Sequence, residues 1–248
     1  MDVYTELEDY GYAMLSEAFD GGCIKRMQTI LDRQIRTDSE GTLAQSESGQ
    51  VYAARNILST APELKSVLEM PVVQRVVRQV LGPDAGLVRA LFFDKPPEQS
   101  WSLPWHKDQS IAVAGHGTLP PGYSRPTVKR GVPHLIAPDA LLQEMITLRI
   151  HLDAMTDENG PLQVVPGSHH SSTDQGVGVE NRKIILAAAG EILAMRPLLT
   201  HSSGLSKPGT TQHRRILHLE FATGPLPEPL QWYEFHPVAT DRCQASFN

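Results

Sequence analysis

The sequence predicts a mainly β protein in which flanking helices support a β-sandwich or jelly roll. The first third of the 248 residues has helical periodicity, and the remainder contains many short strand patterns separated by turns. Helices followed by strands favour this architecture, because a parallel sheet would need strands and helices to alternate. The length suits one large domain. We therefore expect a single domain over residues 1–248, with the N-terminal helices packed on one sheet.

Helical spacing of apolar residues dominates the N-terminal third. It predicts helix over residues 5–36, interrupted by a pair of glycines. Pro62 and Pro71 each suit the first turn of a further helix. Between these helices, residues 37–50 are polar and predict a loop, and residues 51–58 are apolar enough for a short strand.

Strand patterns begin at residues 87–93, which combine aromatic and β-branched side chains. Residues 147–153 alternate strictly, so that apolar side chains share one face while Arg149 and His151 share the other. That second face has two interpretations, an ordinary solvated surface or the wall of a pocket. Further strands are expected at residues 162–165, 184–188, 191–195 and 215–221.

Composition narrows the class of function. With 22 basic and 28 acidic residues, the formal net charge is −6, which argues against nucleic acid or an anionic membrane as the main partner. No apolar run approaches the roughly 20 residues of a membrane-spanning helix. The N-terminus lacks a signal-peptide pattern, and Cys23 and Cys243 are too few for a disulfide framework. We expect a cytoplasmic protein with a small-molecule substrate; the oligomeric state cannot be read from the sequence.

The most informative motif is the pair His106 and Asp108. On a β-strand, residues i and i+2 point to the same face, so the imidazole and carboxylate would project into one cavity. They would form two thirds of the 2-His-1-carboxylate triad that holds Fe(II). Such a pair is common by chance, so a distant histidine must complete the triad. Among several candidates, His201 stands out at the end of an apolar segment, and Arg214 follows it by thirteen residues.

Several motifs together resemble the phytanoyl-CoA dioxygenase-like Fe(II)/2-oxoglutarate oxygenases. The resemblance covers about residues 87–222 and lies in LFFDKPP, WHKD, NGPLQVVPGSHH, HSSG and RRILHLEFA. It implies a double-stranded β-helix, the cupin-like form of the jelly roll. In that scheme residues 1–86 are mostly helical support, residues 87–222 are the barrel core, and residues 223–248 are a C-terminal extension.

The resemblance also implies roles for particular residues. It places Fe(II) on His106, Asp108 and His201. It places the co-substrate 2-oxoglutarate on Ser203 and Arg214, because an arginine fork matches a carboxylate in bidentate geometry. Positions matching Leu91 and Arg149 line the co-substrate pocket. The spacing from histidine to arginine is about two residues longer than in the relatives, so Arg215 rivals Arg214 as the anchor.

The implied activity is hydroxylation of an unactivated C–H bond in a small metabolite, with O2 consumed and succinate and CO2 released. Related halogenases lack the carboxylate that Asp108 supplies, which favours hydroxylation here. One alternative is a cupin-like metal-dependent isomerase, epimerase or oxygenase that does not use 2-oxoglutarate. Another is a non-enzymatic small-molecule-binding barrel.

Residues 115–138 form an insertion rich in glycine and proline, with Lys129 and two arginines among them. A long loop inside a compact domain is usually functional or disordered. We interpret this segment as a lid over the active site, with a surface insertion as the alternative.

Overall fold

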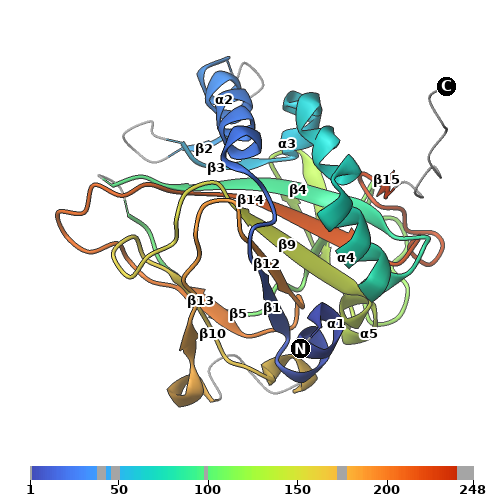
Figure 1. Ribbon diagram of the computed structural model, residues 1–248. Helices are drawn as coiled ribbons and strands as arrows, with labels where there is room; N and C mark the ends of the chain where they lie inside the picture. The colour runs from blue at the N-terminus through green and yellow to red at the C-terminus, as the bar shows by residue number, and fades with distance from the viewer. Residues whose placement is uncertain (1, 38–42, 46–50, 98–99, 172–177, 239–248) are drawn as a thin grey trace, which may run out of the picture.

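The computed structural model describes residues 2–37, 43–45, 51–97, 100–171 and 178–238. Two antiparallel sheets face one another across the centre of the molecule, and helices cover the outer face of the larger sheet (Figure 1). A third, smaller sheet lies beside them. Cys243 and most of the predicted 37–50 loop fall outside the described residues.

The main sheet has the strand order β1-β12-β9-β14-β4-β3-β2, and β15 also pairs with β4. The paired strands are antiparallel, and β14 lies at the centre between β9 and β4. The bounds are β1 (Tyr12–Leu15), β2 (Leu43–Gln45), β3 (Val51–Arg55), β4 (Gly86–Lys95), β9 (Met145–His151), β12 (Ile192–Met195), β14 (Arg214–Ala222) and β15 (His236–Pro237).

The second sheet has the order β11-β10-β13-β5, and the third has the order β6-β8-β7. The second sheet closes the barrel opposite the main sheet, and the third extends from β5 through the short segment that follows it. Their bounds are β5 (Leu103–His106), β6 (Ser110–Ala112), β7 (Ser124–Lys129), β8 (Val132–Ile136), β10 (Leu162–Val164), β11 (Lys183–Ile184) and β13 (His201–Ser203).

Helices α2 and α4 lie over the outer face of the main sheet in Figure 1. Their apolar faces join the outward-pointing residues of β4, β9 and β14 in the largest hydrophobic core, where Phe92, Leu148 and Phe221 are fully buried. The helical elements are α1 (Val3–Asp9), α2 (Gly21–Thr37), α3 (Ile57–Thr60), η1 (Pro62–Glu69), α4 (Pro71–Leu81), α5 (Asp139–Gln143), η2 (Ser168–His170) and η3 (Val179–Asn181).

The prediction of helix throughout 5–36 was wrong at its centre. The chain leaves α1 at Gly11, where φ is +81°, and then forms β1 at the edge of the main sheet. A side chain at Gly11 would meet the ring of His169 and the side chain of Leu199, so this close crossing requires glycine. The residues of β1 are apolar enough for either structure, and pairing with β12 decides between them.

The insertion at 115–138 is not a plain loop. Its second half is the hairpin of β7 and β8, whose two-residue turn has positive φ at Arg130 (51°) and Gly131 (77°), as hairpin turns of the primed types require. Leu135 packs into a second hydrophobic core with Trp232. The role of this hairpin as a lid stays a prediction.

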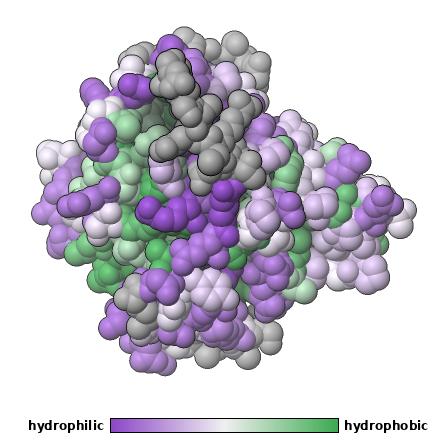
Figure 2. Space-filling view, turned by 45° about the vertical axis from the view of Figure 1, so that its right-hand side comes forward, coloured by the Kyte–Doolittle hydropathy of each residue, from purple (hydrophilic) through white to green (hydrophobic). Residues whose placement is uncertain are grey.

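The polarity of the surface and the length of the described helices can be compared with what a membrane partner would require. The face shown in Figure 2 carries hydrophilic residues around and between smaller groups of hydrophobic ones. Among the described residues, none of the helices combines the length and apolar character that crossing a bilayer requires.

Candidate metal centre

His106, Asp108 and His201 converge although 93 residues separate the last two. One ligand atom from each lies within 4.8 Å of the others. β13 pairs with β5 so that His201 stands directly opposite His106. The predicted placement of Asp108 within a strand was wrong, because β5 ends at His106. Its position is set instead by a hydrogen bond from its backbone N–H to the carbonyl of Pro197, at 2.9 Å.

Backbone carbonyls fix the orientation of both imidazole rings. Nδ1 of His106 lies 2.8 Å from the carbonyl of Pro104, and Nδ1 of His201 lies 2.9 Å from that of Leu199. A proton on each Nδ1 satisfies these contacts and leaves each Nε2 free to bind a metal. The two Nε2 atoms lie 3.7 and 3.6 Å from the Asp108 carboxylate, too far for hydrogen bonds.

The electrostatics of the three residues suit a cation. Burial favours the neutral acid at Asp108, but nearby imidazoles and the Arg89 guanidinium hold its pKa well below the ordinary value. Burial lowers the pKa of His201 to about 4, so its ring is neutral at physiological pH. The buried Oδ2 of Asp108 has no hydrogen-bond partner. A carboxylate with an unpartnered oxygen and two imidazoles with free Nε2 atoms together fit a divalent metal such as Fe(II).

The three candidate metal ligands line one cavity inside the barrel. Arg214 and Ser203 lie together on the wall of that cavity. Arg214 opens β14 and is 2% exposed, and its Nη2 donates to Oγ of Ser203 at 3.1 Å. Its buried Nε has no partner. Burial, followed by the charge of Arg149, lowers the pKa of Arg214 to about 9. A buried guanidinium with an unused N–H is suited to an anionic ligand.

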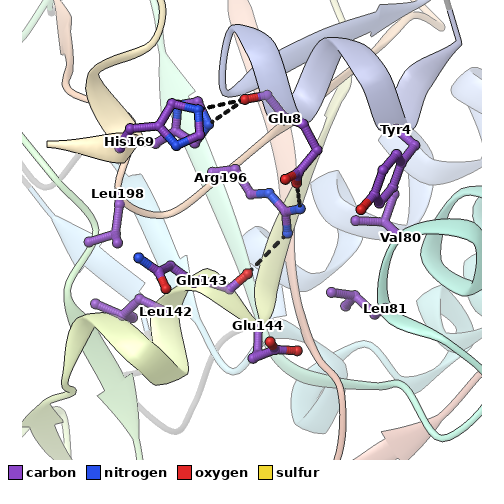
Figure 3. Close-up of a pocket in the computed structure, with 11 residues that line it drawn as sticks. Tyr4, Glu8, Val80, Leu81, Leu142, Gln143, Glu144, His169, Arg196 and Leu198 are labelled. Carbon is purple, nitrogen blue, oxygen red and sulfur yellow. Dashed lines mark hydrogen bonds and ion pairs between the residues drawn. The ribbon is translucent and has the colours of Figure 1, made fainter.

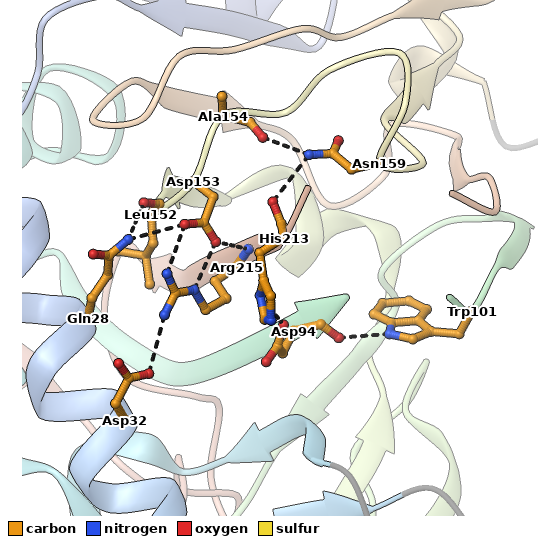
Figure 4. A network of polar contacts seen from close by, with 10 residues as sticks. All are labelled: Gln28, Asp32, Asp94, Trp101, Leu152, Asp153, Ala154, Asn159, His213 and Arg215. Carbon is orange, nitrogen blue, oxygen red and sulfur yellow. Dashed lines mark hydrogen bonds and ion pairs between the residues drawn. The ribbon is translucent and has the colours of Figure 1, made fainter. Parts of the chain in front are cut away.

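Arg215, the rival anchor, lies on the other face of β14 from Arg214, because adjacent strand residues alternate. Figure 4 shows its side chain pointing toward Asp153 and Asp32. Its Nε and Nη2 donate to the two carboxylate oxygens of Asp153 at 2.8 and 2.9 Å, and its Nη1 reaches Asp32 of α2 at 3.2 Å. The same network, outside the barrel, contains Gln28, which donates to the carbonyl of Leu152. Arg215 is thus fully engaged in joining a helix to the sheet.

Sequence reasoning assigned no role to Lys95, which belongs to this cluster. Its amine is fully buried and donates to Oγ of Ser203 at 2.9 Å and to the carbonyls of Gly204 at 2.6 Å and Gly160 at 3.3 Å. It also lies 4.8 Å from the ring centre of Trp101.

Two influences on the charge of Lys95 oppose each other. Burial, then the charges of Arg214 and Arg149, lower its pKa to about 6. Two carbonyl acceptors and an aromatic face instead favour the charged amine. An anion bound among Lys95, Arg149 and Arg214 would raise the pKa of Lys95 and so keep its amine charged.

Arg149 and Leu91 line the same cavity, on either side of β14. Both Arg149 and His151 are buried, so the solvated-surface interpretation of their strand face was wrong. Nη1 of Arg149 lies 3.2 Å from Nδ1 of His218, and Nε2 of His218 lies 3.1 Å from Oε1 of Glu220. Because a guanidinium only donates, Nδ1 accepts and Nε2 carries the proton.

Arg89 completes this row of polar side chains by forming a buried ion pair with Glu220 across β4 and β14. Arg89, His218 and Glu220 were also missed. The sequence signal that could have identified them is the placement of polar residues at alternate positions of a strand. Arg89, Leu91, Phe93 and Lys95 share one face of β4, and Arg214, His218 and Glu220 share one face of β14, within otherwise apolar strands.

A separate cavity of about 480 Å3 lies between α1, α4 and α5 (Figure 3). Arg196 occupies its centre, where it pairs with Glu8 and donates to the carbonyl of Gln143 at 3.2 Å. Rings of His169 and His170 contact the Glu8 carbonyl. These contacts join the N-terminal helix to the strand that precedes His201, which is a structural role.

Comparison with known proteins supports the architecture. A family model described as "Phytanoyl-CoA dioxygenase (PhyH)" matches residues 7–216. Among solved structures, EctD from S. alaskensis in its apoform superposes with a TM-score of 0.70 at 16% identity, covering 91% of this chain and 78% of that one. The non-heme monooxygenase ThoJ gives 0.66 at 18% identity, covering 90% and 77%. The predicted fold class is confirmed.

Two further similarities are to an enzyme matched by sequence and to one matched by fold. L-Proline trans-4-hydroxylase of Streptomyces griseoviridis is 28% identical over 105 residues, which cover 42% of this chain. The match spans about a third of that enzyme's length, 31%. The α-ketoglutarate-dependent epimerase SnoN from nogalamycin biosynthesis superposes with a TM-score of 0.65 at 14% identity, covering 89% of this chain and 79% of that one.

Proposed function

The chain belongs to the phytanoyl-CoA dioxygenase family, and from that premise we propose that it is a non-haem Fe(II)- and 2-oxoglutarate-dependent dioxygenase. In this proposal it hydroxylates an unactivated C–H bond of a small metabolite, consuming O2 and releasing succinate and CO2. The observation that carries the proposal is one cavity with a metal triad and a buried cationic cluster. A metal site alone would fit many cupin-like enzymes, but the cluster of Lys95, Ser203 and Arg214 fits a dicarboxylate.

His106, Asp108 and His201 would hold the iron, and Arg214 with Ser203 would hold the distal carboxylate of 2-oxoglutarate. Oγ of Ser203 accepts from Lys95 and Arg214 and donates to the carbonyl of Gly160 at 3.4 Å, so a carboxylate oxygen would compete with that long bond for the hydroxyl proton. Leu91 and Arg149 would form the walls beside the co-substrate. Bound iron and 2-oxoglutarate supply the oxidising chemistry, whereas the chain binds, orients and excludes water.

The intact carboxylate of Asp108 supports hydroxylation as the outcome. Its oxygens face the two Nε2 atoms, so the carboxylate occupies the position that a halide takes in the related halogenases. The hydroxylase among the sequence relatives agrees with this assignment.

A direct test measures succinate formation by the purified protein with Fe(II), 2-oxoglutarate and ascorbate, against a library of small metabolites. We expect a slow background without substrate and faster succinate release with the true substrate. Metal content after anaerobic purification should approach one iron per chain. Stoichiometric metal without any consumption of 2-oxoglutarate would instead support the cupin-like alternative.

A further inference from the structure

The polar side chains of β14 run along the cavity, from Arg214 at one end to Glu220 at the other. Arg214 and Glu220 both line the cavity and lie six residues apart on one strand, which is roughly 20 Å at 3.3 Å per residue. A five-carbon dicarboxylate is much shorter than this span. If one end of the cavity holds 2-oxoglutarate on Arg214, the end at Glu220 remains for the substrate.

The end at Glu220 carries charged groups of both signs. Glu220 is neutralised by Arg89, whose Nε and Nη2 face its carboxylate, so Nη1 of Arg89 retains N–H groups for another acceptor. The other acidic group nearby, Asp108, belongs to the metal triad. With Glu220 paired to Arg89 and Asp108 assigned to the metal, an additional cation at this end forms no ion pair with either carboxylate.

Lys129 supplies that additional cation from the hairpin of the 115–138 insertion. Its amine donates to Oγ of Ser110 at 3.2 Å, and Ser110 stands two residues after Asp108. None of the ion pairs formed among the described residues includes Lys129. Burial, then the charges of Arg55 and Arg89, lower the pKa of Lys129, and the carboxylates of Glu220 and Asp108 raise it less, so charged groups of both signs act on this amine.

The other basic residues of the hairpin behave differently. Arg125 and Arg130 are exposed, whereas Lys129 is half-buried and reaches the start of β6, two residues after Asp108. A half-buried amine near two guanidiniums, held only by a neutral hydroxyl, is costly unless an anion joins it.

We propose that Lys129 and Arg89 bind an oxyanion of the substrate, a carboxylate or a phosphate, at the end of the cavity opposite Arg214. The proposal rests on the proposed function, since it takes the Arg214 end as the 2-oxoglutarate site. It makes the substrate an anionic metabolite whose charged group lies beyond the metal, so that the C–H bond to be oxidised is presented between them.

The experiment uses the full chain with Co(II) in place of iron and saturating 2-oxoglutarate. Three probes are titrated at constant ionic strength: acetate, inorganic phosphate, and acetamide as the neutral counterpart of acetate. Paramagnetic relaxation of the probe nuclei by Co(II) reports binding near the metal and needs no turnover. We expect relaxation of acetate, phosphate or both, and none of acetamide; acetate alone identifies a carboxylate, and phosphate alone a phosphate.

Variants at the hairpin supply the decisive comparison. Lys129→Gln should weaken binding of the relaxed anion at least about tenfold, as expected for losing one hydrogen bond to a charged group. Lys129→Arg should restore it, and the exposed neighbour Arg130→Gln should leave it unchanged. Equal binding of acetamide, no relaxation of either anion, or an unaltered Lys129→Gln variant would each overturn the proposal.

The protons of 2-oxoglutarate serve as an internal reference. If they are relaxed by Co(II) while the probe anions are not, the proposed function stands and this inference fails. If 2-oxoglutarate itself is not relaxed in the wild-type protein, the proposed function fails and the inference falls with it.

Discussion

The two faces of β14 differ in polarity and in what they contribute to the protein. Arg214, His218 and Glu220 point into the barrel, where they are buried and polar, whereas Leu217, Leu219 and Phe221 point outward into the hydrophobic core. Burying charged groups contributes little to stability even when they are paired, whereas burying the apolar face contributes strongly. One strand therefore carries binding chemistry on one face and folding free energy on the other, and substitutions on the two faces should have separable effects.

The largest expected effect is on the inner side. His106→Ala should abolish both metal binding and turnover, because the two remaining ligands leave the metal without the triad geometry. Metal analysis after anaerobic reconstitution, with succinate release measured in parallel, checks this. The exposed His170→Ala serves as the control. Stoichiometric iron and retained activity in the His106 variant would remove it from the triad.

Phe221→Ala tests the outer face. Its side chain is fully buried, so truncation should lower the free energy of unfolding by about 3–5 kcal/mol. Urea denaturation measures this loss. The affinity for metal in the folded variant should match wild type, and a large change in that affinity would show that the two faces are coupled.

Arg214→Ala and Arg215→Ala compare adjacent residues on the two faces. Arg214→Ala should raise the apparent Kd for 2-oxoglutarate by at least about two orders of magnitude, on about 1.4 kcal/mol per decade, because a buried charge partner is lost. Arg215→Ala should leave that Kd unchanged and lower stability by about 1–3 kcal/mol through its lost bonds to Asp153. The reverse pattern would make Arg215 the anchor.

The smallest expected effect is the contribution of His151, on the inner face of β9, to the pH dependence of stability. Burial lowers the pKa of His151 to about 4, so the folded protein keeps this ring neutral while the unfolded chain binds a proton below about 6.5. Stability from this residue is present above pH 6.5 and is lost as the pH falls towards 4, by at most about 3 kcal/mol.

His151→Asn isolates that contribution. The amide can keep the hydrogen bond that Nδ1 makes to the carbonyl of Glu191, but it does not titrate in this range. Urea denaturation of the metal-free protein at several pH values should show a shallower loss of stability between pH 6.5 and 4 in the variant. An identical slope in both proteins would contradict a neutral buried ring.

Local patterns in the sequence predicted the fold class and brought His106, Asp108, His201 and Arg214 together as candidates. What they could not provide was the register between strands. Lys95 and Glu220 matter because β4 and β14 pair so that alternate residues face the same cavity, and nothing near either residue specifies that pairing. For the same reason the sequence did not predict β1. Its apolar residues suit either helix or strand, and the pairing with β12 selects the strand.

The pairing of β13 with β5 also has a consequence for the order of events during synthesis. His106 and Asp108 leave the ribosome 95 and 93 residues before His201, which at about 5–20 residues per second is roughly 5–20 seconds. Throughout that interval the nascent chain offers two of the three proposed ligands, and Arg214 has still to be made. If the proposed triad holds the metal, tight binding must wait until β13 has paired with β5, late in synthesis.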